Sequence, residues 1–206
     1  MKLCVFDFDS TLMAGETIDF LAKAVGKENQ VSQITEQAMS GEIGFFESLS
    51  ERAKLLEGLS QRKLEEICHN LPLMNGAKET ILALKQKGYK VVIFSGGFRT
   101  ATSYYAPILG ADADFANFLD IKDGLLTGRV AGEMMANDAK GSMLVRLQKL
   151  LDIDVTDTLA VGDGANDLSM FKYAGTKIAF CAKDILKDAA DYVLDEQDLR
   201  LVLEHI

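Results

Sequence analysis

The sequence predicts an α/β fold in which helices cover both faces of a mainly parallel sheet. From residue 77 onward, short apolar runs that suit buried strands alternate with helical patterns, and this alternation is typical of a parallel sheet. A hydrophobic fraction of 48% with only two prolines is typical of a globular protein. A chain of 206 residues is also long enough to bury a substantial hydrophobic core.

The first strand is expected at Lys2–Phe8, and strand-like sequence then disappears. From Glu16 to Leu71 the apolar residues recur at helical spacing, as at Ile18, Leu21 and Val25. A segment of this length is too long for a plain loop, and it predicts an inserted helical cap beside the sheet. We therefore expect residues 15–71 to form the cap, and residues 1–14 and 72–206 to form the core.

The later elements alternate between helix and strand. Between Phe115 and Arg129, the turn Lys122-Asp123-Gly124 separates two short apolar segments, which predicts a β-hairpin excursion. The other elements are predicted from apolar periodicity as helices at Ala77–Lys87 and Ser142–Leu151 and strands at Lys90–Phe94, Thr158–Val161, Lys177–Phe180 and Asp191–Leu194.

Composition argues against several classes of function. A formal net charge of −9, without a basic stripe, argues against nucleic-acid binding. The longest apolar runs fall far short of the roughly 18 residues of a membrane-spanning helix. Three widely spaced cysteines without a Cys-x-x-Cys pair predict packing residues in a reducing cytoplasm. His69 and His205 are too few and too scattered for a His-based triad or a zinc site.

Two carboxylates stand where the first expected strand ends. Strand side chains alternate between faces, so Asp7 and Asp9 should point the same way, about 7 Å apart along the strand. Like charges in this arrangement call for a cation nearby.

Further polar groups follow other predicted strands. In an open parallel sheet, ligands bind beyond the carboxyl ends of the strands. Ser95 and two glycines follow one strand, and the backbone amides of glycines can approach an anion closely. Asp163, Asn166 and Asp167 follow another strand. Oxygen ligands without His or Cys favour a hard ion, of which Mg²⁺ is the first candidate.

Other interpretations of the run Gly162–Asp167 fail on spacing. An EF-hand loop opening at Asp163 would need an oxygen ligand at position 165 and a Glu at 174, but both positions hold Ala. A dinucleotide G-x-G-x-x-G motif from Gly162 would need glycine at position 167, and no Walker motif occurs in the sequence. Lys140 lies at the start of a predicted helix, where the helix dipole disfavours a cation, so a local anion is expected beside it.

An acid pair, a hydroxyl with glycines, a lysine and a second acid pair thus follow one another in separate elements. In this order they resemble the four signature motifs of the haloacid dehalogenase superfamily of phosphotransferases. The resemblance covers essentially the whole chain and implies a Rossmann-like core with the inserted cap and the hairpin. The matching segments are Asp7–Thr11, Ser95–Gly97, Lys140 and Gly162–Asp167.

Further segments resemble the members of that superfamily that hydrolyse O-phospho-L-serine, in the short form without an amino-terminal regulatory domain. By this resemblance Glu16 receives the substrate ammonium, and Arg52 holds its carboxylate in a bidentate fork. Met39 and Phe45 would line the closed cap. The segments that carry this narrower match are Asp7–Leu12, Glu16–Asp19, Phe45–Arg52 and Ser95–Phe98.

The resemblance also implies a reaction, in which L-serine and phosphate form through an aspartyl-phosphate as the last step of serine biosynthesis. Asp7 would be the nucleophile and Asp9 the general acid and base. The phosphoryl oxygens would be bound by Ser95, the Gly96 amide and Lys140, which Asn166 orients. Mg²⁺ would be held by Asp7, the Asp9 backbone carbonyl and Asp163, with a metal-bound water ordered by Asp167.

Three alternatives stay open. The first is a related member of the fold that hydrolyses another small phosphomonoester or transfers its phosphoryl group to an acceptor. The second is a receiver-like regulatory module, which has no need of a cap enclosing a small substrate. The third is a degenerate binding protein. The presence of every catalytic position in the sequence argues against it. The sequence does not decide between a monomer and a homodimer.

Overall fold

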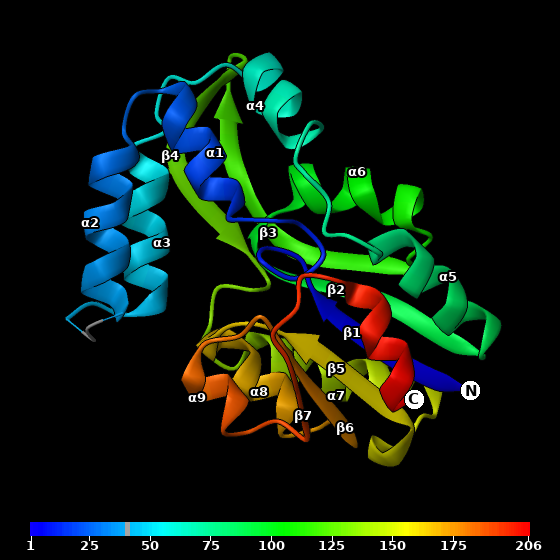
Figure 1. Ribbon diagram of the computed structural model, residues 1–206. Coiled ribbons are helices and arrows are strands. Elements are labelled where there is room, and N and C mark those ends of the chain that lie inside the picture. The colour runs from blue at the N-terminus through cyan, green and yellow to red at the C-terminus, as the bar shows by residue number, and fades with distance from the viewer. Residues whose placement is uncertain (40–41) are drawn as a thin grey trace.

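A sheet of seven strands organises the chain in the computed structural model, which describes residues 1–39 and 42–206 (Figure 1). The strand order is β4-β3-β2-β1-β5-β6-β7, and every neighbouring pair is parallel except β3 with β4. The expected α/β fold is therefore confirmed. The strands are β1 (Lys2–Asp7), β2 (Tyr89–Phe98), β3 (Ala113–Lys122), β4 (Leu125–Gly132), β5 (Thr158–Gly162), β6 (Thr176–Phe180) and β7 (Tyr192–Leu194).

The first strand of the chain lies in the middle of the sheet. β1 pairs with β2 on one side and with β5 on the other, and its residues 3–7 are buried. An uninterrupted apolar run suits such a strand, because helices cover both of its faces. Asp7 is the last residue of β1, so the fold places this carboxylate at the centre of the carboxyl edge.

Alternate residues of β1 pack into two hydrophobic clusters. Cys4 and Phe6 face a cluster that includes α5 (Ala77–Gln86) and α6 (Arg99–Leu109). Leu3 and Val5 face the other cluster. Its helices are α7 (Ala139–Leu151), α8 (Leu168–Phe171) and α9 (Asp184–Lys187). A 3-10 helix at Leu199–His205 adds to the first cluster.

Four helices occupy the described part of the chain between β1 and α5. Across the described part of residues 8–76, no strand interrupts them. The predicted helical segment is thus confirmed, and Figure 1 shows these helices gathered around the β3–β4 hairpin. Their bounds are α1 (Thr17–Ala24), α2 (Glu28–Met39), α3 (Phe45–Lys54) and α4 (Gln61–Cys68).

The expected β-hairpin is also present and touches the helical segment. Asp123 and Gly124 both have positive φ, which suits the tight turn between β3 and β4. Beyond the turn, the backbone N–H of Leu126 donates to the Leu59 carbonyl at 2.8 Å, and the Gly58 N–H donates to the Leu126 carbonyl at 2.9 Å. Residue 128 is glycine because a Cβ there would lie 3.1 Å from the Lys54 Cα.

Two boundaries differ from expectation by more than one residue. β2 continues to Phe98 instead of ending at Phe94, although its register with β3 shifts between these two residues. The helix expected from Ser142 begins at Ala139, which brings Lys140 into its first turn. Within residues 1–39 and 42–206, no helix combines the length and apolar character that crossing a membrane requires.

Candidate active site

A cavity of about 660 Å³ opens at the carboxyl edge of the sheet, beneath the helical segment. Residues from β1, β2, α1, α3, α7 and the loop after β5 meet there, as parallel sheets of this kind favour. Ser95 and Asp167 are fully buried beside its walls. The other predicted site residues all line the cavity, namely Asp7, Asp9, Glu16, Arg52, Gly96, Lys140, Asp163 and Asn166.

A buried lysine bridges two carboxylates at the bottom of the cavity. Lys140 Nζ lies 2.7 Å from Asp7 Oδ1 and 2.6 Å from Asp167 Oδ1. Burial alone would lower the pKa of Lys140, but these two carboxylates raise it above its usual value. The anion that the sequence requires beside this lysine is therefore a pair of aspartates.

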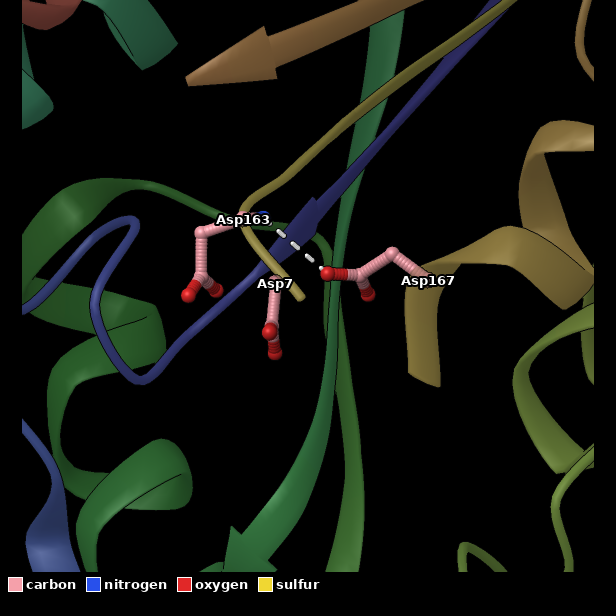
Figure 2. A group of neighbouring side chains, drawn as sticks. All are labelled: Asp7, Asp163 and Asp167. Carbon is pink, nitrogen blue, oxygen red and sulfur yellow. Dashed lines mark hydrogen bonds between the residues drawn. The ribbon is translucent and has the colours of Figure 1, made fainter. Parts of the chain in front are cut away.

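Three aspartates form a group that could hold a metal ion (Figure 2). One carboxylate oxygen from each of Asp7, Asp163 and Asp167 lies within 4.8 Å of the others. Burial, followed by the charge of Asp167, raises the pKa of Asp7 well above its usual range and that of Asp163 to about 6. Oxygen donors that repel one another in this way fit a hard divalent cation, so the residues present suit a metal site.

The loop after β5 orients Asp167. Its Oδ2 accepts hydrogen bonds from the backbone N–H groups of Asp163 and Gly164, both at 3.1 Å. A Cβ at Gly162 would lie 2.4 Å from this same oxygen, so only glycine allows the loop to close so tightly. The backbone thereby leaves Asp167 Oδ1 turned to Lys140.

Asp9 lies beyond the end of β1 and has its own partners. The Thr17 backbone N–H donates to Asp9 Oδ1 at 2.8 Å, and the Thr17 hydroxyl donates to the same oxygen. Ser95 Oγ lies 3.2 Å from Asp9 Oδ2. Burial raises the pKa of Asp9, although these hydrogen bonds act in the opposite direction. The Asp9 side chain is not among the three carboxylates of the candidate metal group.

Gly97 is required by this arrangement. A Cβ at this position would lie 2.4 Å from Asp9 Oδ2 and 3.1 Å from Ser95 Oγ. The Gly97 N–H donates to Ser95 Oγ at 2.9 Å. Ser95 and Gly97 therefore adjoin Asp9, one member of the predicted acid pair.

Opposite charges face each other at the other end of the cavity. Ser10 Oγ donates to Glu16 Oε1 at 2.7 Å. Partial loss of hydration beside the cavity, followed by the charge of Asp9, raises the pKa of Glu16 to about 8, although Glu16 is an exposed residue. Arg52 Nε donates to the Ser48 carbonyl at 3.2 Å, and Arg52 forms no ion pair within the described residues. Its guanidinium remains available to an anionic ligand.

Several residues of the site were not identified from the sequence. Thr17 holds Asp9, and its position in the first turn of a helix was a usable signal. Lys183 and Asn137 line the cavity from loops whose approach the sequence pattern does not reveal. The side chains of Met39 and Phe45, expected to line the closed cap, lie outside the described part of the structure.

Comparison with known proteins agrees with this geometry. The family profile of haloacid dehalogenase-like hydrolases matches residues 1–175. The phosphoserine phosphatase of Wolinella succinogenes is 55% identical over 206 residues, which cover 100% of both chains. The chain belongs to the phosphoserine phosphatase family of haloacid dehalogenase-like hydrolases.

Other members of the phosphoserine phosphatase family share both sequence and fold with this chain. The phosphoserine phosphatase of Methanocaldococcus jannaschii is 49% identical over 205 residues, covering 100% of this chain and 97% of the relative. A solved structure described as a phospho-aspartyl intermediate analogue of phosphoserine phosphatase superposes with a TM-score of 0.95 at 49% identity. A substrate-bound phosphoserine phosphatase complex gives the same values, and in both cases 100% of this chain and 98% of the other are covered.

Proposed function

We propose that the protein hydrolyses O-phospho-L-serine to L-serine and phosphate through an aspartyl-phosphate on Asp7. The observation that carries this proposal is the buried Asp7 carboxylate, held by Lys140 in a cavity that ends in a Glu16 and Arg52 pair. An acid nucleophile and a zwitterion-binding pair in one cavity match a phosphorylated amino acid. The phosphoserine phosphatases to which the chain is similar support this substrate.

In the first step, a carboxylate oxygen of Asp7 attacks phosphorus as the bond between phosphorus and the serine oxygen breaks. Asp9 gives its proton to the departing serine oxygen, a role that its raised pKa favours. In the second step, Asp9 takes a proton from water, the water oxygen bonds to phosphorus, and the bond to Asp7 breaks. Both carboxylates return to their starting states.

The phosphoryl group is bound by donors at the carboxyl edge. The Ser95 hydroxyl, the Gly96 amide and the Lys140 ammonium are assigned to its oxygens, and Asn166 orients this set. Preorganised donors of this kind stabilise the charge that develops during transfer. The hydrogen bonds that fix Ser95 and Lys140 before substrate arrives support this assignment.

We assign the metal group to Mg²⁺, because carboxylate and carbonyl oxygens are its preferred ligands. Asp7, the Asp9 backbone carbonyl and Asp163 would hold the ion, and Asp167 would order one of its waters. When bound, the ion would neutralise charge between the nucleophile and the phosphoryl group.

At the other end, Glu16 would receive the substrate ammonium and Arg52 its carboxylate. Both are brought by the helical segment, which we propose is a cap formed by residues 15–71 over a core of residues 1–14 and 72–206. We further propose that the enzyme acts in the cytoplasm at the last step of serine biosynthesis. Its three free cysteines suit a reducing compartment.

The test is phosphate release from O-phospho-L-serine with Mg²⁺ or with EDTA, beside phosphothreonine, p-nitrophenyl phosphate and a sugar phosphate. We expect a strong, metal-dependent preference for O-phospho-L-serine, no turnover by D7N, and a raised KM for R52A. Preference for another phosphomonoester, or transfer to an added alcohol, would favour the related phosphatase or phosphotransferase. A fully active D7N protein that has not deamidated would refute the aspartyl-phosphate mechanism.

A further inference from the structure

We propose that Asn117, a residue of β3 outside the cavity lining, positions the Ser95 hydroxyl and thereby the Asp9 carboxylate. The proposal rests on the proposed function, in which Asp9 is the general acid. Asn117 is fully buried, and among the described residues its side chain bonds only to the backbone of two other segments. It touches no reacting group, so its role would be that of a positioning residue.

A chain of hydrogen bonds leads from Asn117 to Asp9. Asn117 Nδ2 donates to the Gly96 carbonyl at 3.0 Å. That carbonyl belongs to the same peptide unit as the Gly97 N–H, which donates to Ser95 Oγ at 2.9 Å. In the free enzyme Ser95 Oγ donates to Asp9 Oδ2 at 3.2 Å, and this contact between the two oxygens keeps Asp9 beside Ser95 whichever of them carries the proton. Because a peptide unit is planar, fixing its carbonyl also fixes the direction of its N–H.

The pairing of β2 with β3 is irregular around the Gly96–Gly97 peptide. The register between β2 and β3 shifts between Phe94 and Phe98, the stretch that contains Gly96. Two successive glycines there have a wide choice of backbone conformations. The amide of Asn117 fixes one carbonyl of this irregular stretch in place.

The other bonds of Asn117 reach Met134, which also lines the cavity. Asn117 Oδ1 accepts the Met134 N–H at 3.0 Å, and Nδ2 lies 3.4 Å from the Met134 carbonyl. Met134 belongs to the connector between β4 and α7, and this helix brings Lys140 to the site. Gly132 permits the approach, because a Cβ there would lie 2.5 Å from Asn117 Oδ1. The Asn117 side chain therefore links the segment of β2 beside Ser95 and Asp9 to the connector that leads to Lys140.

The experiment compares N117A with Q148A. Gln148 is also a buried amide, and its Nε2 donates to Thr158 Oγ1 at 2.9 Å and to the Tyr173 carbonyl at 2.8 Å, but it does not line the cavity. Both variants remove buried hydrogen bonds, and both are expected to lower the melting temperature. Only N117A should alter catalysis by the folded, Mg²⁺-loaded enzyme.

The readout is kcat/KM for two substrates, since this ratio covers the steps up to departure of the leaving group. O-phospho-L-serine has a leaving group that must be protonated, whereas p-nitrophenolate leaves with little help from an acid. A displaced Asp9 should reduce kcat/KM for O-phospho-L-serine roughly tenfold or more, because general acids contribute about 10²- to 10⁴-fold. The loss for p-nitrophenyl phosphate should be several times smaller, and inhibition by L-serine should be unchanged.

A second variant guards against simple failure to fold. N117L keeps roughly the volume of the side chain but has no donor for the Gly96 carbonyl. It should show the same selective loss. Equal losses on both substrates, or values for N117A and N117L within twofold of wild type, would overturn the proposal. A wild-type protein that does not hydrolyse O-phospho-L-serine would instead refute the proposed function.

Discussion

Replacement of Lys140 by methionine should destabilise the protein strongly and abolish turnover. The lysine is 3% exposed and lies between Asp7 and Asp167 at 2.7 and 2.6 Å, so K140M leaves two buried carboxylates without their cation. Breaking a buried ion pair in this way costs about 3–5 kcal/mol. For a protein of this size, each kcal/mol lowers the melting temperature by roughly 2–4 °C, which gives a decrease of roughly 6–20 °C.

The destabilisation should depend on pH. Lys140 lowers the pKa of Asp7 in the wild type, so K140M lets that pKa rise further above its value in the unfolded chain. The folded variant then binds a proton more readily than the unfolded one, and its stability increases as the pH falls. Lys140 itself has a raised pKa and is charged at both pH 5 and pH 8. The difference between K140M and wild type should therefore be larger at pH 8 than at pH 5.

The assay is thermal unfolding in EDTA at these two pH values, with K140M/D167N as the matched control. The second substitution removes one of the two orphaned charges, so it should restore part of the stability and none of the activity. Equal destabilisation at both pH values, together with a double variant no more stable than K140M, would show that lost packing and not uncompensated charge governs the site.

Three more predictions follow from the same geometry. Glu16 has a pKa of about 8, and its carboxylate form is the one that would bind the substrate ammonium, so kcat/KM for O-phospho-L-serine should rise as the pH increases through that value. E16Q should abolish this rise and leave the pH profile for p-nitrophenyl phosphate unchanged. G97A should lower kcat at least severalfold, because its methyl group would meet Asp9 Oδ2, whereas G44A adds a methyl group to open space and should not. Removing Mg²⁺ with EDTA should lower the melting temperature more at pH 8 than at pH 5, since Asp163, with a pKa of about 6, is charged only at the higher pH.

The sequence predicted those parts of the site that depend on local order along the chain. Asp7 ends one buried strand and Asp163 follows another, and the rule that parallel strands end at one edge was enough to bring them together. Lys140 was placed correctly because a cation at a helix start needs an anion. These inferences need no knowledge of how distant side chains pack.

The partners of Asp9 could not be predicted in the same way. Thr17 reaches Asp9 only because the turn after β1, with Ser10 at a φ of 57°, bends the chain back on itself. Asn117 comes from a strand that the sequence marked only as one arm of a hairpin. Its role depends on a register shift between β2 and β3, and such a shift leaves no periodic signal in the sequence.

The contact between the hairpin and the helical segment has a mechanical consequence. Gly58, Leu59 and Gln61 share backbone hydrogen bonds of 2.8–2.9 Å with the tip and outer arm of the hairpin. The helices therefore cannot swing away alone: they must carry the hairpin with them or lose these bonds. Asn117 belongs to β3 of the same hairpin and donates to the Gly96 carbonyl. A movement of these helices that carries the hairpin would therefore displace β3 and, through Asn117, the Gly96–Gly97 peptide whose N–H contacts Ser95 Oγ.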